Sequence, residues 1–183
     1  MNFVEGEILE KAWDGTLSEE DRELVQRQIR DYLGQMRAIK SPDGVICTFG
    51  NRPAIDSRMF FEYGGPFANE SDYNDFLVSD LHDFVTPATN NLRSQLRELE
   101  PHEIFFTHGD LHAINIIARP GEGIVAVLDW ELAGYYPEYL DFVKPFRPAM
   151  WKCGYYQEFH DFFPTKYERE YMIDQLLSTY TRH

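Results

Sequence analysis

A short polar segment near the middle of the chain carries residues whose types and spacing could do chemistry together. Residues 108–115 read HGDLHAIN, and a second carboxylate, Asp129, follows in the sequence LDWE. A carboxylate can accept the proton of an attacking hydroxyl, while an amide oxygen and a second carboxylate can hold Mg²⁺ against phosphate groups. These roles would fall to Asp110 as the base and to Asn115 and Asp129 as the magnesium ligands.

The spacing within this segment is that of a known catalytic loop. The positions H-x-D-L-x-x-x-N match the protein-kinase catalytic loop, in which the Asn follows the catalytic Asp by five positions. His108 would steady the loop by hydrogen bonding. Glu131 is a supporting candidate because it lies two positions after Asp129 and could reach Mg²⁺ or the phosphoryl acceptor. A structural salt bridge explains Glu131 equally well.

A different kind of metal site is an alternative interpretation of the same residues. His108, Asp110 and His112 alternate along the chain, so on an extended strand they would share one face and could bind Zn²⁺ or Fe²⁺. Gly109 favours a turn over a strand, however, and the catalytic-loop pattern explains the same residues. We therefore prefer the loop and expect His112 to be only a loop residue.

Short β-branched runs must position these side chains. Residues 115–118 and 124–129 flank a Gly-containing loop, which predicts an antiparallel hairpin. The hairpin would return the second carboxylate to the side of the amide, so that the three catalytic candidates converge at one cleft. Residues 103–107 predict a strand directly before the catalytic segment. Residues 135–138 are expected to lead into a helix.

Amphipathic helices surround this small sheet. Ser18 and Asp21 form a capping-box pattern ahead of apolar residues at helical spacing, which predicts a helix of about five turns. Further helices are expected from Ser71, over residues 88–99, and from Thr165. The expected apolar positions are Leu24, Val25, Ile29, Tyr32, Leu33 and Met36 in the first helix, Tyr73, Phe76, Leu77, Leu81, Phe84 and Val85 in the second, Leu92, Leu96 and Leu99 in the third, and Met172, Leu176, Leu177 and Tyr180 in the last.

The composition limits the class of protein. The 183 residues suit one domain, residues 1–183, and 17 Lys and Arg against 31 Asp and Glu give a formal net charge of −14. This acidity, without a basic stripe, argues against nucleic acid as a partner. No apolar run approaches the ~20 residues that a membrane span needs. Two cysteines and no apolar leader at the N-terminus indicate a cytoplasmic protein with free thiols.

Beyond the catalytic loop, the chain resembles the aminoglycoside phosphotransferase and choline-kinase-like family. The family hallmarks HGDxxxxN and DWExAG correspond to HGDLHAIN and DWELAGYYPEYLD, while GGPFANESDY and NFVEGEILEKAW are similar to the fungal branch. The similarity covers almost the whole chain. It implies an α+β, mainly helical fold, that of a protein-kinase-like C-terminal lobe with a small β-hairpin. The implied activity is ATP- and Mg²⁺-dependent phosphoryl transfer to a hydroxyl of a small molecule.

The resemblance also places the start of the chain at the hinge under the adenine of ATP, so Glu5 and Gly6 are the adenine contacts that it implies. In the family a complete N-terminal lobe precedes this hinge, whereas no G-x-G-x-x-G or V-A-I-K stretch occurs within the 183 residues. We therefore expect a chain without that lobe, which a partner could supply. The alternative is a kinase-derived scaffold, for example in secondary metabolism, that binds or transforms a small molecule without phosphorylating it.

Aromatic residues gather toward the C-terminal end and have two explanations. They could line the cleft of such a repurposed scaffold, but ordinary core packing is the simpler explanation. These residues are Trp151, Tyr155, Tyr156, Phe159, Phe162 and Phe163.

Overall fold

Helices form most of the regular structure. The computed structural model describes residues 4–56, 62–79, 81, 86–99, 101–145 and 153–181. The α-helices are α1 (Leu9–Asp14), α2 (Glu19–Arg37), α3 (Glu70–Leu77), α4 (Pro87–Arg97), α5 (Leu140–Val143), α6 (Gly154–Glu158) and α7 (Glu168–Thr181). Short 3₁₀ turns cover Ala113–Asn115 and Phe159–Phe162. Within the described residues, we find no helix with the length and hydrophobicity needed to cross a bilayer.

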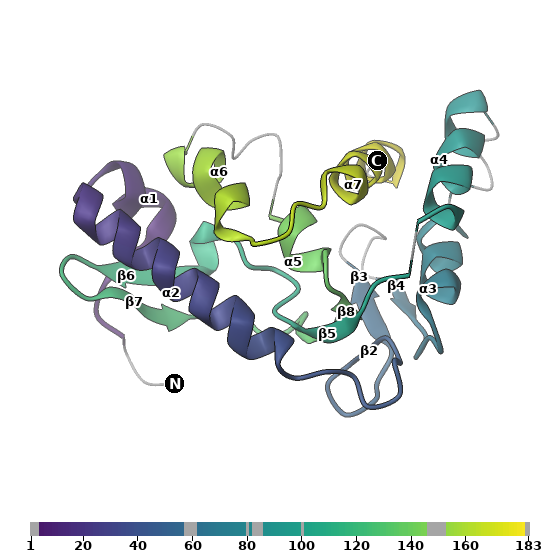
Figure 1. Ribbon diagram of the computed structural model, residues 1–183, viewed down its shortest axis with the longest axis horizontal. Helices are drawn as coiled ribbons and strands as arrows, with labels where there is room; N and C mark the ends of the chain where they lie inside the picture. The colour runs from purple at the N-terminus through teal and green to yellow at the C-terminus, as the bar shows by residue number, and fades with distance from the viewer. Residues whose placement is uncertain are drawn as a thin grey trace.

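The strands form small antiparallel sheets, which makes the fold α+β as predicted. They are β1 (Glu7–Ile8), β2 (Cys47–Thr48), β3 (Ala54–Asp56), β4 (Glu62–Gly64), β5 (Ile104–Thr107), β6 (Ile116–Arg119), β7 (Gly123–Val127) and β8 (Gly134–Pro137). The strand orders are β1-β6-β7, β2-β8-β5 and β3-β4. Figure 1 shows the first sheet beside α1 and α2 at one end of the molecule, with α3 and α4 at the other end.

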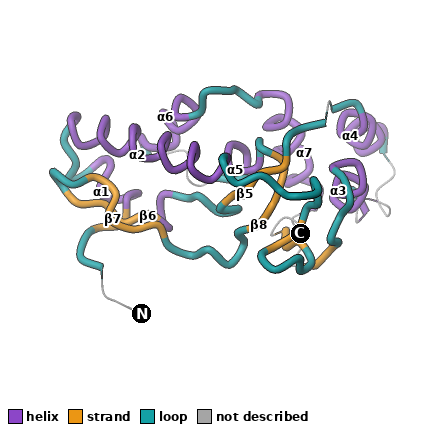
Figure 2. The backbone as a smooth tube through the Cα atoms, turned by 60° about the horizontal axis from the view of Figure 1, so that its bottom comes forward, coloured by secondary structure: helices purple, strands orange, loops and turns teal. Residues whose placement is uncertain are grey.

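Two chain crossings connect the first sheet to the second. Residues 108–115 run from β5 to β6, and residues 128–133 run from β7 to β8. The predicted hairpin is confirmed, because β6 and β7 pair antiparallel with Ile116 opposite Val127. Both segments that carry the catalytic candidates therefore lie where the two sheets adjoin, as the loops between the strands in Figure 2 show.

The long helix α2 begins where the sequence predicts. The Ser18 hydroxyl accepts a hydrogen bond from the Asp21 N–H at 3.2 Å, and the Asp21 carboxylate accepts one from the Ser18 N–H at 3.0 Å. This capping box satisfies amide groups that have no partner within the first turn of a helix. Its buried face packs along β5 and β7. That face contains Val25, Ile29, Leu33 and Met36.

The second predicted helix is shorter than expected, and the third is confirmed as α4. Helix α3 begins at Glu70 and ends at Leu77 rather than continuing to residue 85. A turn after Leu77 carries Leu81 into the core, where its side chain is fully buried. The predicted core positions Phe84 and Val85 lie outside the described residues.

The last helix is confirmed, but two of its expected apolar positions face solvent. Ile173 and Leu177 are buried, whereas Met172 and Leu176 are exposed. The reason is tertiary, because α7 packs on α4 and α5 and these neighbours determine which face is covered. Leu176 and Leu177 are adjacent, so the helix cannot bury both against one neighbouring surface.

Strand β8 corrects the expectation that residues 135–138 only lead into a helix. Residues 134–137 pair with both β5 and β2, and α5 starts three residues later at Leu140. The pairing places Gly134 against Cys47 and Thr48, where a side chain would collide with the backbone of β2. This strand completes the sheet that carries the N-terminal end of the catalytic segment.

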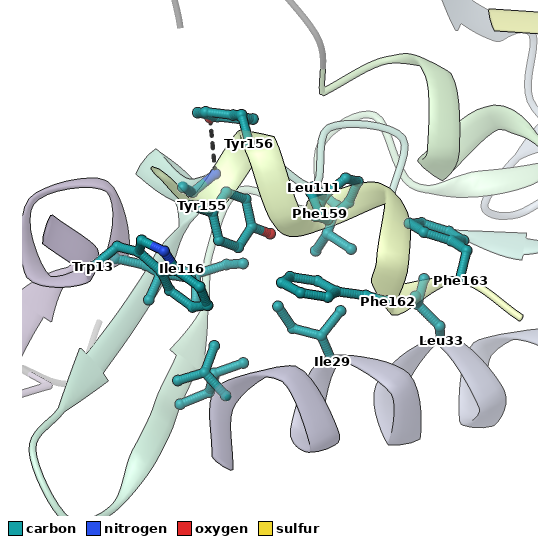
Figure 3. Close-up of a cluster of buried hydrophobic side chains, with 14 of the residues drawn as sticks. Trp13, Ile29, Leu33, Leu111, Ile116, Tyr155, Tyr156, Phe159, Phe162 and Phe163 are labelled. Atoms are coloured by element: carbon teal, nitrogen blue, oxygen red, sulfur yellow. Dashed lines mark hydrogen bonds between the residues drawn. The ribbon is translucent and has the colours of Figure 1, made fainter. Parts of the chain in front are cut away.

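A buried aromatic cluster lies beside the first sheet. It lies between α1, α2, the β6–β7 hairpin and α6, where Trp13 meets Tyr155 edge-on with ring centroids 5.3 Å apart (Figure 3). Core packing is therefore confirmed for the C-terminal aromatic residues that the structure describes; Trp151 lies outside the described residues. The buried residues are Tyr155, Tyr156, Phe159, Phe162 and Phe163. A second cluster joins α3, α4, α7 and β8.

Candidate active site

The Asp110 carboxylate accepts a hydrogen bond on one oxygen and has a close contact on the other. Asn115 Nδ2 donates a hydrogen bond of 2.8 Å to Oδ2, and His112 Nε2 lies 3.1 Å from Oδ1. The side chain nevertheless keeps 19% of its surface accessible. Asp110 is thus an oriented carboxylate that a substrate hydroxyl could still approach.

Asn115 is positioned by the turn that precedes β6. Its Nδ2 also donates to the backbone carbonyl of Asp110 at 2.9 Å, so both of these hydrogen bonds use the nitrogen end of the amide. Its backbone N–H donates to the carbonyl of His112, which closes the 3₁₀ turn. The amide oxygen is therefore turned away from Asp110 and is the atom that could ligate a cation.

The hairpin returns Asp129 to the side of Asn115, as predicted. The Leu128 N–H donates to the Asn115 carbonyl at 2.7 Å, so the neighbouring Asp129 begins the crossing directly beside that residue. Asp129 is exposed and has a φ of +59°, in the left-handed region that non-glycine residues seldom adopt. Such backbone outliers concentrate at functional sites, because the surrounding fold must impose them.

His108 connects the two candidate segments. The Asp110 N–H donates to His108 Nδ1 at 3.2 Å, so the ring proton lies on Nε2, which donates to the Leu128 carbonyl at 2.9 Å. One buried imidazole therefore joins the residue that carries the base to the residue that precedes Asp129. This matches the steadying role predicted for His108.

The same hydrogen bonds decide against the Zn²⁺ or Fe²⁺ interpretation. Both ring nitrogens of His108 point to protein atoms, so this residue offers no lone pair to a metal ion. Gly109 has a φ of +79°, which turns the chain instead of extending it. In the part of the chain that the structure describes, no three His, Cys, Asp or Glu side chains form a metal-binding group.

Asp141 also positions the loop, although the sequence analysis assigned it no role. Its buried carboxylate accepts hydrogen bonds from the N–H groups of His108 at 3.1 Å and Gly109 at 2.9 Å. Burial raises the pKa of this carboxyl, while the hydrogen bonds from the two N–H groups act in the opposite direction. The residue closes the quoted segment DWELAGYYPEYLD, so the signal was present but carried no assigned role.

The remaining predicted site residues lie around this centre. Glu131 is exposed and lines a cavity of about 420 Å³. The Glu5 carbonyl accepts a hydrogen bond of 2.7 Å from Arg119 Nη2, and Gly6 packs so closely on Ile117 that a side chain would collide there. Glu5 and Gly6 therefore lie near the end of β6 that is farther from the base. Their contact with adenine stays a prediction.

Comparison with known proteins agrees with the geometry of the loop. Residues 1–168 match the phosphotransferase enzyme family, which is more than half of the chain. No curated protein gives a significant match. The match includes the whole of the loop, the hairpin and Asp141. With its HGDLHAIN loop and the returning Asp129, the chain belongs to the phosphotransferase enzyme family.

Proposed function

We propose that this chain is the catalytic part of a small-molecule kinase, which transfers the γ-phosphoryl group of ATP to a hydroxyl of its substrate. The observation that supports this most directly is the pair of contacts on Asp110, from Asn115 Nδ2 and His112 Nε2. They orient a partly exposed carboxylate, as general base catalysis requires. Membership of the phosphotransferase enzyme family supports the same class of reaction.

In the proposed reaction, Asp110 accepts the proton of the acceptor hydroxyl. The hydroxyl oxygen forms a bond to the γ-phosphorus while the bond from that phosphorus to ADP breaks. Mg²⁺ would be held by the Asn115 amide oxygen and the Asp129 carboxylate, because such oxygens are the ligands that it prefers. The bound ion supplies positive charge that neutralises the phosphates. His108 keeps the two ligand-bearing segments together.

In the proposed function, the nucleotide lies near the N-terminal residues of the chain. By resemblance to the family, the adenine would lie against the segment that contains Glu5 and Gly6. The 183 residues include neither a Gly-rich phosphate loop nor a V-A-I-K lysine. In the proposed function, a partner supplies an N-terminal lobe that binds the phosphates.

A second candidate function would use the same partly exposed Asp110 carboxylate. The cleft beside Asp110 could bind or transform a small molecule without phosphoryl transfer, because the base and its supporting loop do not themselves need a nucleotide. The two candidates differ in their dependence on ATP and Mg²⁺.

An assay of phosphoryl transfer separates them. The purified chain is incubated with a library of hydroxylated small molecules and with Mg·ATP well above the Kd, on the order of millimolar, that we expect for the 183 residues, and transfer of labelled phosphate is measured. We expect any transfer to fall at least about 100-fold in Asp110→Asn, because the base is lost, with an unchanged melting temperature. Asp31→Asn, an exposed carboxylate on α2, is the matched control.

Transfer that persists in Asp110→Asn would contradict the assigned base. If no library member is phosphorylated, but one binds and its binding or conversion is sensitive to Asp110→Asn, the second candidate function replaces the first.

A further inference from the structure

A cavity of about 420 Å³ is lined by Trp130 and Glu131, which directly follow the proposed magnesium ligand Asp129 in the sequence. Its walls come from three parts of the chain: the loop after β2, the β3–β4 hairpin, and the crossing from β7 to β8 that begins beside Asp129. The volume is in the range that holds one drug-sized molecule. The main lining side chains are Phe49, Arg52, Tyr63, Trp130 and Glu131.

Three aromatic side chains around this cavity are unusually exposed. Phe49 keeps 72%, Tyr63 69% and Trp130 44% of their accessible surface. Single exposed apolar residues are common, but large aromatic residues gathered around one concave site are characteristic of ligand binding. Phe49 and Tyr63 belong to neither of the two buried clusters of the described residues.

Trp130 forms a rigid wall of the cavity. Its indole Nε1 donates to the Val127 carbonyl at 3.0 Å, and its ring stacks on Phe106 with an interplanar angle of 8°. The His108 ring lies 4.5 Å away on the catalytic side. The indole is therefore fixed before any ligand arrives, and a ring bound against it would lie next to the segment that carries Asp129.

The charges on the walls indicate which ligands suit the site. Among the described lining side chains there is one carboxylate, Glu131, and one guanidinium, Arg52. These charges are of opposite sign and equal number, so the described walls carry no net charge that would attract a polycation. The aromatic surfaces favour a flat group that can stack.

We propose that this cavity is the acceptor pocket and that it takes a neutral aromatic alcohol, with the ring between Trp130 and the pair Phe49 and Tyr63. The inference rests on the proposed function, since it names the substrate class of that site. The hydroxyl would extend past Trp130 toward the two crossings, one of which carries Asp110 and the other Asp129.

Binding can be measured without nucleotide by isothermal titration of the full chain. The probes are three neutral aromatic alcohols, 2-phenylethanol, 4-hydroxyphenylethanol and 2-naphthylethanol, and one polycationic aminocyclitol, neamine. We expect at least one aromatic alcohol to bind more tightly than neamine. Phe49→Ala and Tyr63→Ala should each weaken that binding about three- to tenfold, the loss expected for one aromatic contact. Met172→Ala removes an exposed apolar side chain on α7, outside the cavity, and should bind like the wild type.

Tighter binding of neamine, no binding of any aromatic alcohol, or equal affinity in the alanine variants would each overturn the proposal. The outcome is separable from that of the proposed function. If the alcohols bind as expected but are not phosphorylated with Mg·ATP, the kinase function fails and the pocket stands. If neamine alone is phosphorylated, the pocket assignment fails and the kinase function stands.

Discussion

At the scale of single residues, the catalytic loop is shaped by groups that do no chemistry. Gly109 adopts a φ of +79°, and a Cβ there would collide with the Leu132 carbonyl oxygen in the crossing that follows Asp129. Asp141 accepts hydrogen bonds from the two N–H groups that flank this turn. The two crossings can approach each other this closely because Gly109 has no side chain. The distance between the candidate base and Asp129 therefore depends on this glycine.

Gly109→Ala should therefore destabilise the protein by at least about 2 kcal/mol, which combines the left-handed penalty with the steric collision. Gly121→Ala is a matched control, because Gly121 has a φ of +78° and no atom near the position of its Cβ. It should cost only the left-handed penalty of about 1 kcal/mol. Urea unfolding of both variants measures the difference. Equal losses would show that the contact with Leu132 imposes no constraint.

The positions of the candidate site residues could be predicted from local sequence signals. The supporting role of Asp141, which is distant in the sequence, could not. Asp110 and Asn115 are fixed by their separation along the chain, and Asp129 by a hairpin with its own turn signal. Asp141 supports the loop across 32 positions of sequence, after a strand that was not predicted. Nothing local distinguishes this carboxylate from exposed ones, so its burial is a tertiary property.

At the scale of elements, one partly buried histidine contacts three of them. His102, just before β5, places Nδ1 2.9 Å from Glu70 at the start of α3 and Nε2 3.4 Å from Glu170 in the first turn of α7. Its backbone N–H donates to Glu70 as well, at 2.7 Å. The rings of Tyr139 and Tyr167 pack against the imidazole. A protonated His102 between two carboxylates is therefore an electrostatic clamp on α3 and α7.

This clamp predicts a loss of stability at alkaline pH. Burial alone lowers the pKa of His102, but the hydrogen bonds and charges of Glu170 and Glu70 outweigh it and raise the pKa to about 9. The usual value is 6.5, so the contribution is complete below pH 6.5 and is lost as the pH rises through 9. Allowing for solvent screening, we expect about 2 kcal/mol.

The measurement is the free energy of unfolding in urea between pH 7 and pH 9.5, for the wild type and His102→Gln. The variant should lack most of the decrease seen in the wild type. His160→Gln is the control, because burial lowers the pKa of His160 to about 4, so this residue stays neutral over the whole range. A wild type whose stability is constant over this range would rule out the clamp.

Elements with local signals were predicted and those defined by pairing were not. Helix α2 has its capping box, and the β6–β7 hairpin has β-branched runs around a glycine loop. The sequence GYYP of β8 has no alternation and contains Pro137, so its pairing with β5 and β2 is invisible without the rest of the sheet. The same reasoning explains α7, whose buried face is set by α4 and α5.

At the scale of the whole molecule, the two crossings place the catalytic candidates between two separately packed halves. One half contains α1, α2, the β6–β7 hairpin and the aromatic core, and the other contains α3, α4, α7 and β8. The base lies on the crossing from β5 to β6 and Asp129 on the crossing from β7 to β8. Under the proposed function, the base, the magnesium ligands and the acceptor cavity would therefore lie at one junction.

We expect the 183 residues by themselves to bind ATP only weakly. Phosphoryl transfer depends on positioning and on neutralising phosphate charge, and no Gly-rich loop or V-A-I-K lysine is present to do either. A net charge of −14 also disfavours the approach of an anionic nucleotide. We expect the 183 residues to bind Mg·ATP with a Kd on the order of millimolar or weaker, about 4 kcal/mol of binding free energy. Calorimetric titration of the wild type and of Asp129→Ala tests this, and micromolar binding that the substitution abolishes would show that the chain grips the nucleotide by itself.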